Sequence, residues 1–143
     1  MKIKIASIGN YLAAALLMVM GIIYLTKTSF MYYHSEAVSL DWNEVESNIQ
    51  VLILALMKAV SGGLITGSIT IMYLQFKFTT TRLSWIPVLI LIIGIVLSGT
   101  ILYAMLIVKL KTPGSPPFFL TISGTVLLII GYIFNMSYIK DKN

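Results

Sequence analysis

The chain of 143 residues contains no cysteine and only one histidine. The lack of cysteine excludes disulfide bonds, thiolate metal sites and thiol-linked redox chemistry. A single histidine cannot supply the paired imidazoles of a transmembrane haem site. Neither a glycine-rich phosphate loop nor a nucleophile–base pair at a known spacing occurs. The sequence therefore favours a protein without a cofactor and gives little support for an enzyme.

Charged residues are scarce as well. They make up 10% of the chain, whereas soluble domains carry about 25%, and 58% of the residues are hydrophobic. Four apolar runs, at residues 6–25, 49–76, 85–108 and 118–136, are each long enough to cross a hydrocarbon core of about 30 Å. We therefore predict an all-α fold: one integral membrane domain, residues 1–143, built as a bundle of four antiparallel helices.

The few charges are unevenly distributed around these runs. Cations on the side of the termini are Lys2, Lys4, Lys77, Arg82, Lys140 and Lys142. On the other side there are only Lys27, Lys109 and Lys111. The positive-inside rule then places both termini in the cytoplasm of a bacterial or archaeal cell. The net charge of +5 is explained by this topology, and we expect a multi-pass protein of the cytoplasmic (inner) membrane with no nucleic-acid partner.

The first apolar run also follows two lysines, as the core of a secretory signal does. It is about 20 residues long, however, and a signal core has 7–15. We expect it to be a retained membrane span.

The outer loop, residues 26–48, holds the histidine and four of the five acidic residues. Asp41 followed three residues later by Glu44 fits a capping box, which predicts that the second long helix begins near Trp42. His34, Glu36 and Asp41 are candidate metal ligands by residue type, although their spacing matches no metal motif and suits an exposed loop equally well.

Aromatic residues also gather in this loop. Tyr32, Tyr33 and His34, together with Trp42, are typical of an interfacial belt that lays a loop on the membrane surface.

Lys58 is the most informative residue of the sequence, because it lies alone within the second apolar run. A charge near the middle of a spanning helix costs about 2.5–3.5 kcal/mol, and none of the four runs contains an acidic partner. One hypothesis is that Lys58 binds an anionic group; the alternative is a structural contact or a side chain that reaches the interface. Ser61 and Gly62 lie on the same helical face. With Gly63 they mark the place where this helix is expected to bend or pack closely.

The third and fourth runs each contain the tripeptide Ser-Gly-Thr, which is more often a helix-packing element than a ligand site. Counted from the outer ends, these hydroxyls fall near the depth of Lys58. The candidate ligand-binding residues are therefore Lys58, Ser61, Ser98, Thr100, Ser123, Thr125 and Trp42.

Part of the sequence resembles a class of small four-span bacterial membrane proteins to which no activity is attached. The resemblance covers about a quarter of the chain, in the outer loop and the second span. It is carried by Tyr33-His34, Trp42, Gln50, Leu54-Ala-Leu-Met-Lys58 and Gly62-Gly63. It implies that His34, Trp42 and Lys58 belong to one functional unit.

Two functions are compatible with these features. The first is a non-catalytic binding or accessory protein that holds a membrane lipid, another anionic amphiphile or a partner helix at Lys58, with the outer loop as a lid. This hypothesis predicts that Lys58→Leu removes binding and leaves the fold intact or more stable. The second is a membrane enzyme or small transporter with a metal or substrate site around His34. A partner membrane subunit and a homo-oligomer are both compatible with the glycine-lined faces.

Overall fold

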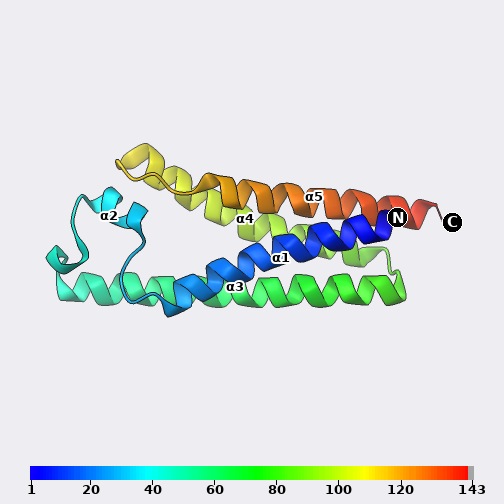
Figure 1. The fold of residues 1–143 in the computed structure, drawn as a ribbon, viewed down its shortest axis with the longest axis horizontal. Coiled ribbons are helices and arrows are strands. Elements are labelled where there is room, and N and C mark those ends of the chain that lie inside the picture. The colour runs from blue at the N-terminus through cyan, green and yellow to red at the C-terminus, as the bar shows by residue number, and fades with distance from the viewer. Residues whose placement is uncertain (142–143) are drawn as a thin grey trace.

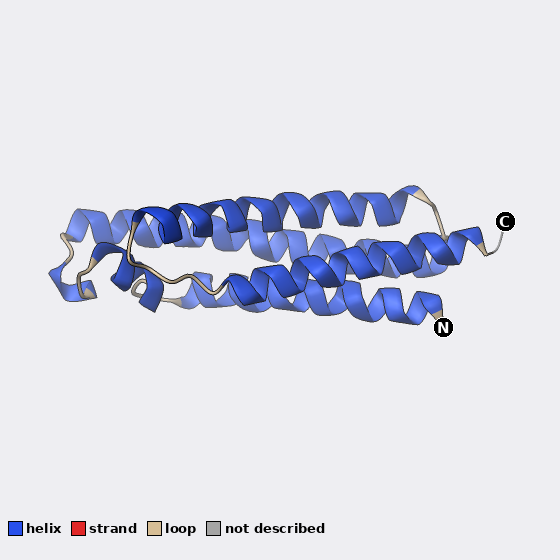
Figure 2. Cartoon of the chain, turned by 90° about the horizontal axis from the view of Figure 1, so that it is seen from above, coloured by secondary structure: helices blue, strands red, loops and turns tan. Residues whose placement is uncertain are grey.

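The computed structural model describes residues 1–141, which form helices and connecting turns without any strand. The four long helices run side by side, with both termini at one end of the bundle and a short helix, Tyr32–Val38, at the other (Figure 1). The elements are α1 (Lys2–Thr26), α2 (Tyr32–Val38), a 3₁₀ turn η1 (Trp42–Glu44), α3 (Ser47–Thr81), α4 (Trp85–Lys111) and α5 (Phe118–Lys140). We call the two ends of the bundle the termini end and the α2 end. The prediction of an all-α fold is confirmed for this part of the chain, and Figure 2 shows helix along nearly all of its length.

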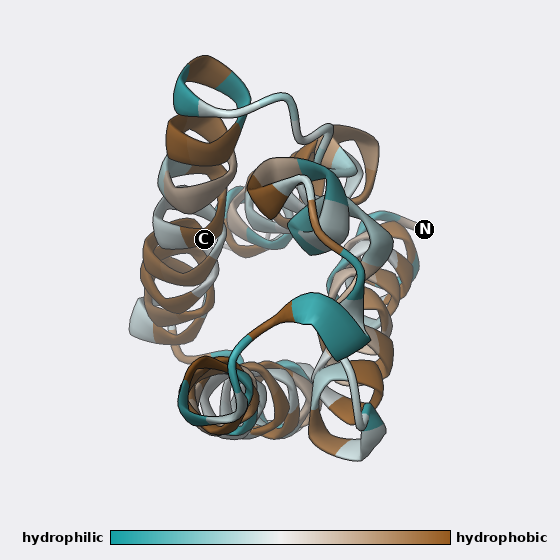
Figure 3. Ribbon diagram, turned by 90° about the vertical axis from the view of Figure 1, so that its left-hand side faces the viewer, coloured by the Kyte–Doolittle hydropathy of each residue, from teal (hydrophilic) through white to brown (hydrophobic). Residues whose placement is uncertain are grey.

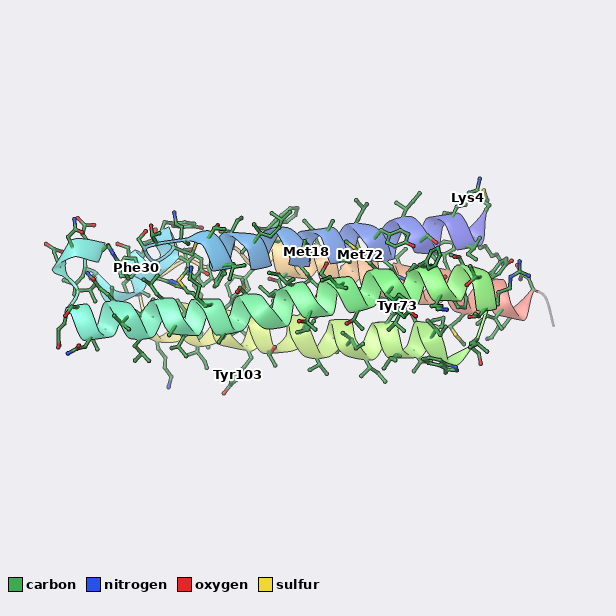
Figure 4. The ribbon with its side chains drawn as sticks, turned by 90° about the horizontal axis from the view of Figure 1, so that it is seen from below. Lys4, Met18, Phe30, Met72, Tyr73 and Tyr103 are labelled. Carbon is green, nitrogen blue, oxygen red and sulfur yellow. The ribbon has the colours of Figure 1, made fainter. Side chains whose placement is uncertain are left out.

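The four long helices are apolar enough to cross a membrane. Large hydrophobic side chains point outward along their whole length, as Tyr103 does in Figure 4. Figure 3 shows that hydrophobic residues predominate in the long helices, whereas hydrophilic residues are concentrated in the connections. Lipid chains solvate such an exterior, and each helix satisfies its own backbone hydrogen bonds. The chain therefore has the form of a multi-pass membrane protein.

The capping box in the outer loop forms, but it does not start the long helix. The backbone N–H of Asp41 donates to Glu44 Oε2 at 2.9 Å, and this box begins the single turn η1. Val45 then adopts an extended conformation, which ends the turn. Because of this break α3 starts at Ser47, and the predicted start near Trp42 is wrong.

Each helix of the bundle packs against two others: α1 and α4 each contact both α3 and α5. Glycines allow the closest approaches, since a methyl group at Gly67 would clash with Leu97 and one at Gly131 would clash with Asn10. Of the segment predicted to bend or pack closely, Ser61 is fully buried, but a Cβ atom added at Gly62 or Gly63 would meet no atom within 4 Å, so the prediction of close packing is wrong for the two glycines. Both face away from the bundle, and α3 continues through them unbroken.

The tight core lies toward the termini end. Its buried residues are Ala13, Ala14, Ile71, Leu74, Phe78, Ile86, Ile90 and Leu128. An ion pair of 2.7 Å between Lys2 Nζ and Asp141 Oδ2 joins the two ends of the chain there. The helices are thus held together at the termini end, and their arrangement at the α2 end is looser.

Candidate ligand-binding cavity

A cavity of about 620 Å³ lies between the four long helices at the α2 end. Its walls come from α1, α2, α3, α4 and α5, and they are almost wholly apolar. No Lys, Arg, Asp or Glu lines it within the described residues. Cavities with such apolar walls bind apolar ligands. This cavity is therefore suited to an uncharged hydrocarbon chain.

The cavity forms because the helices diverge. At Gly67 of α3 the neighbouring helix α4 approaches so closely that Leu97 fills the space a methyl group would need. Farther toward the α2 end, Val60 of α3 and Ala104 of α4 both line the cavity and are exposed. The pair α1 and α3 separates from the pair α4 and α5 in the same direction (Figure 1).

Helix α2 closes the end of the cavity, and we call it the lid. Tyr33 is only 5% exposed and lines the cavity together with His34 and Ala37. The lid is attached to the α4–α5 connection, where the backbone N–H of Ser115 donates to Glu36 Oε2 at 3.0 Å. Gly114 packs directly beneath the lid, where a side chain would collide with the carbonyl oxygen of Tyr33.

A small polar cluster lies under the lid. The hydroxyl groups of Tyr24 and Tyr33 hydrogen bond to each other, and burial raises the pKa of Tyr33 well above its ordinary value. The Nδ1 atom of His34 accepts the backbone N–H of Met31 at 3.4 Å, which places the proton of a neutral imidazole on Nε2. Burial lowers the pKa of His34, so this ring is neutral at pH 7. Phe30 packs edge-on against it, at 6.5 Å between the ring centroids.

Ser98 is a polar residue of the cavity wall. It is 5% exposed, and its Oγ makes no hydrogen bond with any described residue. Thr100 and Thr125 also line the cavity, but their hydroxyls donate to carbonyl groups of their own helices. Of the hydroxyls in the two Ser-Gly-Thr segments, that of Ser98 alone both lines the cavity and lacks a hydrogen-bond partner among the described residues.

Lys58 occupies a different place from the one that its isolation in the sequence suggests. Its ammonium donates to three backbone carbonyls at the end of α1: Tyr24 O at 3.3 Å, Lys27 O at 2.7 Å and Leu25 O. The last carbonyls of a helix have no partner within the helix, and they carry the negative end of its dipole. Lys58 therefore caps α1, and its side chain is not part of the cavity wall.

The level of Lys58 along the bundle explains how the charge is tolerated. Helix α3 has 35 residues, about 52 Å, and so it extends well beyond α1. Lys58 lies where α1 ends, and Lys77 follows it by 19 residues, about 28 Å. This interval matches a hydrocarbon core of about 30 Å. Along the bundle, Lys58 thus lies at the level where α1 ends and 11 residues from the start of α3.

The structure separates the other predicted ligand-binding residues. Ser61 is fully buried and donates to the carbonyl of Lys58 at 2.6 Å, outside the cavity. Ser123 does not line the cavity, and Trp42 packs on Phe30 with ring centroids 4.8 Å apart. His34, Trp42 and Lys58 do not contact one another directly: Phe30 lies between the rings of His34 and Trp42, and Tyr24 contacts His34 through its ring and Lys58 through its carbonyl.

The predicted metal ligands are not brought together. Among the described residues no group of three His, Asp or Glu side chains is placed to hold a metal ion. His34 faces the apolar cavity, whereas Glu36 and Asp41 line a separate shallow pocket of about 300 Å³. Glu36 binds the backbone of Ser115, and Asp41 belongs to the box that caps η1. Their acceptor atoms thus have structural uses in the loop.

A buried polar network in the tight half was not anticipated from the sequence. Gln75 Oε1 accepts the amide groups of Asn10 at 2.7 Å and Asn135 at 2.9 Å, and Gln75 Nε2 donates to Ser7 Oγ at 3.0 Å. Asn10, Gln75 and Asn135 are fully buried, on α1, α3 and α5. These three residues are isolated amides within long apolar runs, and amide side chains in membrane spans often hydrogen bond across helices. Their positions could therefore have indicated such a network. The network holds three helices together at the termini end.

The arrangement as a whole combines an apolar cavity, a lid with neutral hydrogen-bonding groups, and a capped helix end beside it. It can enclose a hydrocarbon chain and offer hydroxyl and imidazole groups to a neutral polar atom of the same ligand. No protein-family model, curated protein or solved structure matches this chain.

Proposed function

We propose that this protein is a non-catalytic binding or accessory protein that holds the apolar chain of a membrane amphiphile in the cavity beneath the lid. The cavity itself is the observation that carries the proposal: about 620 Å³ of apolar space, with no charged wall residue among those described. Burying hydrocarbon there gains about 0.8 kcal/mol per CH₂ relative to water. A hydrocarbon chain that enters the cavity from a bilayer gains much less free energy than one that enters from water, so such binding is reversible.

We also propose that the protein lies in the cytoplasmic membrane, with antiparallel spans and both termini in the cytoplasm. The excess of cations at the termini end supports this orientation, with Lys4 visible there in Figure 4. The cavity then lies in the outer half of the bilayer. Lys58 contributes indirectly, because it fixes the end of α1 from which the chain continues into the lid.

The experiment that tests this function fills the cavity with a side chain. Gly124 lines the cavity, and a methyl group placed there would meet only Leu16, at 3.9 Å. Gly124→Phe is expected to fold and to abolish binding of a chain-labelled fluorescent phospholipid in detergent micelles. Gly99→Phe is the matched control, since Gly99 points into open space outside the cavity. Equal binding by both variants would contradict the proposal.

A further inference from the structure

The cavity reaches the surface of the bundle on two sides. Between α3 and α4 its exposed lining residues are Leu56, Val60, Thr100 and Ala104. Between α1 and α5 they are Val19 and Leu120. The lid covers the end of the cavity that faces water. A ligand therefore reaches this space from the side, where the neighbours of the helices are lipid chains.

The register of α3 against α4 sets the depth of one opening. The two helices touch at Gly67 and Leu97. Val60 lies seven residues, or two turns, from Gly67, and Ala104 lies seven residues from Leu97. Both border the opening. Seven residues beyond Ala104, on the same face of α4, lies Lys111. Lys111 is exposed and about 10 Å closer to the α2 end than the opening, at the depth of lipid headgroups.

The two openings differ in charge. The opening between α3 and α4 has Lys111 above it, in the last turn of α4. Above the opening between α1 and α5 lies the α4–α5 connection, to which the carboxylate of Glu36 and the hydroxyl of Tyr32 are bound at Ser115. At the second opening the exposed Lys27, at the end of α1, opposes the charge of Glu36, so an anionic headgroup is attracted more strongly to the first opening. The first opening is also bordered by more exposed cavity residues.

We infer that an anionic bilayer phospholipid enters the cavity between α3 and α4 and is held there with its phosphate at Lys111. One acyl chain passes Val60 and Ala104 into the apolar space, and the headgroup stays outside it. This inference rests on the proposed function and narrows its ligand to a lipid of the surrounding bilayer. It also explains how an uncharged cavity serves a charged lipid, because only the chain is enclosed.

Photolabelling tests this route. The protein is reconstituted in phosphatidylcholine vesicles that contain a small fraction of phosphatidylglycerol or phosphatidylcholine with a photoactivatable acyl chain. Label on Leu128, a buried wall residue, reports the cavity, whereas label on the exposed Ile129 reports the outer surface. Phosphatidylglycerol is expected to label Leu128 more strongly than phosphatidylcholine does. Lys111→Gln is expected to reduce that labelling about fivefold, since one surface cation contributes about that factor.

Two matched variants complete the design. Lys109→Gln removes the same charge from the same helix end but from a different face, and it is expected to leave the labelling unchanged. Val60→Trp should block the opening between α3 and α4, whereas Val19→Trp, at an equally exposed wall residue on the other side, should not reduce labelling.

The possible outcomes are distinct. Equal effects of Lys111→Gln and Lys109→Gln would overturn the headgroup site. Blocking by Val19→Trp alone would overturn the route and leave the proposed function standing. Labelling of Ile129 but never of Leu128 in the wild type, with either lipid, would contradict the proposed function itself.

Discussion

Among single residues, Lys58 has a role in the structure that differs from the one its sequence position predicts. In the sequence it is a lone cation in an apolar run, and that isolation predicts a ligand site. In the structure its three acceptors are backbone carbonyls of another helix, 31–34 residues away along the chain. Every residue has a backbone carbonyl, so a sequence does not indicate which carbonyls accept a side-chain hydrogen bond. The role of Lys58 as a helix cap could therefore not be predicted. The lysine stabilises the end of α1 by donating to carbonyls that lack a partner within the helix.

Lys58→Leu is therefore expected to destabilise the protein, which is the opposite of the effect predicted from the sequence. Hydrogen bonds to a charged group contribute about 1.5–3 kcal/mol, and the loss of the cap leaves several carbonyls of α1 without a partner. Denaturant titration in detergent, monitored by circular dichroism, measures the change in unfolding free energy. Lys109→Leu, on an exposed helix end, is the control. An unchanged or increased stability of Lys58→Leu would show that the cap is dispensable.

His34 makes the closure of the lid dependent on pH. Because burial lowers its pKa in the closed state, the open lid binds a proton more readily than the closed one. Closure is fully stable above the unperturbed pKa of about 6.5 and weakens as the pH falls from there toward the lowered value. The protection of residues 32–38 against hydrogen exchange, taken relative to the intrinsic exchange rate at each pH, is expected to fall as the pH is lowered from 7.5 to 5. His34→Phe should remove that dependence; if it persists, another group is responsible.

At the scale of the elements, the lid is the part that the sequence described least well. The loop was expected to act as a lid, yet neither α2 nor the late start of α3 was foreseen. Helix α2 has only seven residues and depends on contacts with Gly114 and Ser115, about 80 residues away in the chain. Short helices are marginal alone, so local patterns cannot identify one that tertiary contacts stabilise.

Gly114→Val is expected to displace the lid. A Cβ atom at Gly114 would lie 2.8 Å from the carbonyl oxygen of Tyr33 and 3.0 Å from Ala37 Cβ, so α2 must move away. Limited proteolysis should then cut within residues 27–46 faster than in the wild type, several-fold. Gly99→Val adds the same side chain in open space and should leave the cleavage rate unchanged. Similar rates in both variants would mean that the lid is not held at Gly114.

At the scale of the whole molecule, the two ends of the bundle have different physical characters. The termini end has a packed core, the amide network of Gln75 and the ion pair of Lys2, and it holds the helices together. At the α2 end the helices diverge around the cavity. The termini end therefore holds the fold together, while the α2 end remains open to a ligand.

The number and positions of the four long helices could be predicted from the sequence, because long apolar runs are a strong and local signal. The cavity could not be, since its walls are ordinary apolar residues such as Leu16 and Met105, whose types are the same in a packed core. Ser98, Thr100 and Thr125 were singled out from their shared tripeptide and do line it; Ser123, from the same pattern, does not. The rotation of each helix about its own axis decides which of these residues face the cavity. That rotation is set by contacts between distant segments of the chain.

The most direct test of the central claim is native mass spectrometry of the protein purified from its own membrane in mild detergent. We expect the wild type and Gly99→Phe to carry a discrete additional mass of one lipid, and Gly124→Phe, whose cavity is filled, to carry none. Bare protein in all three cases, or the same bound mass in all three, would contradict the account.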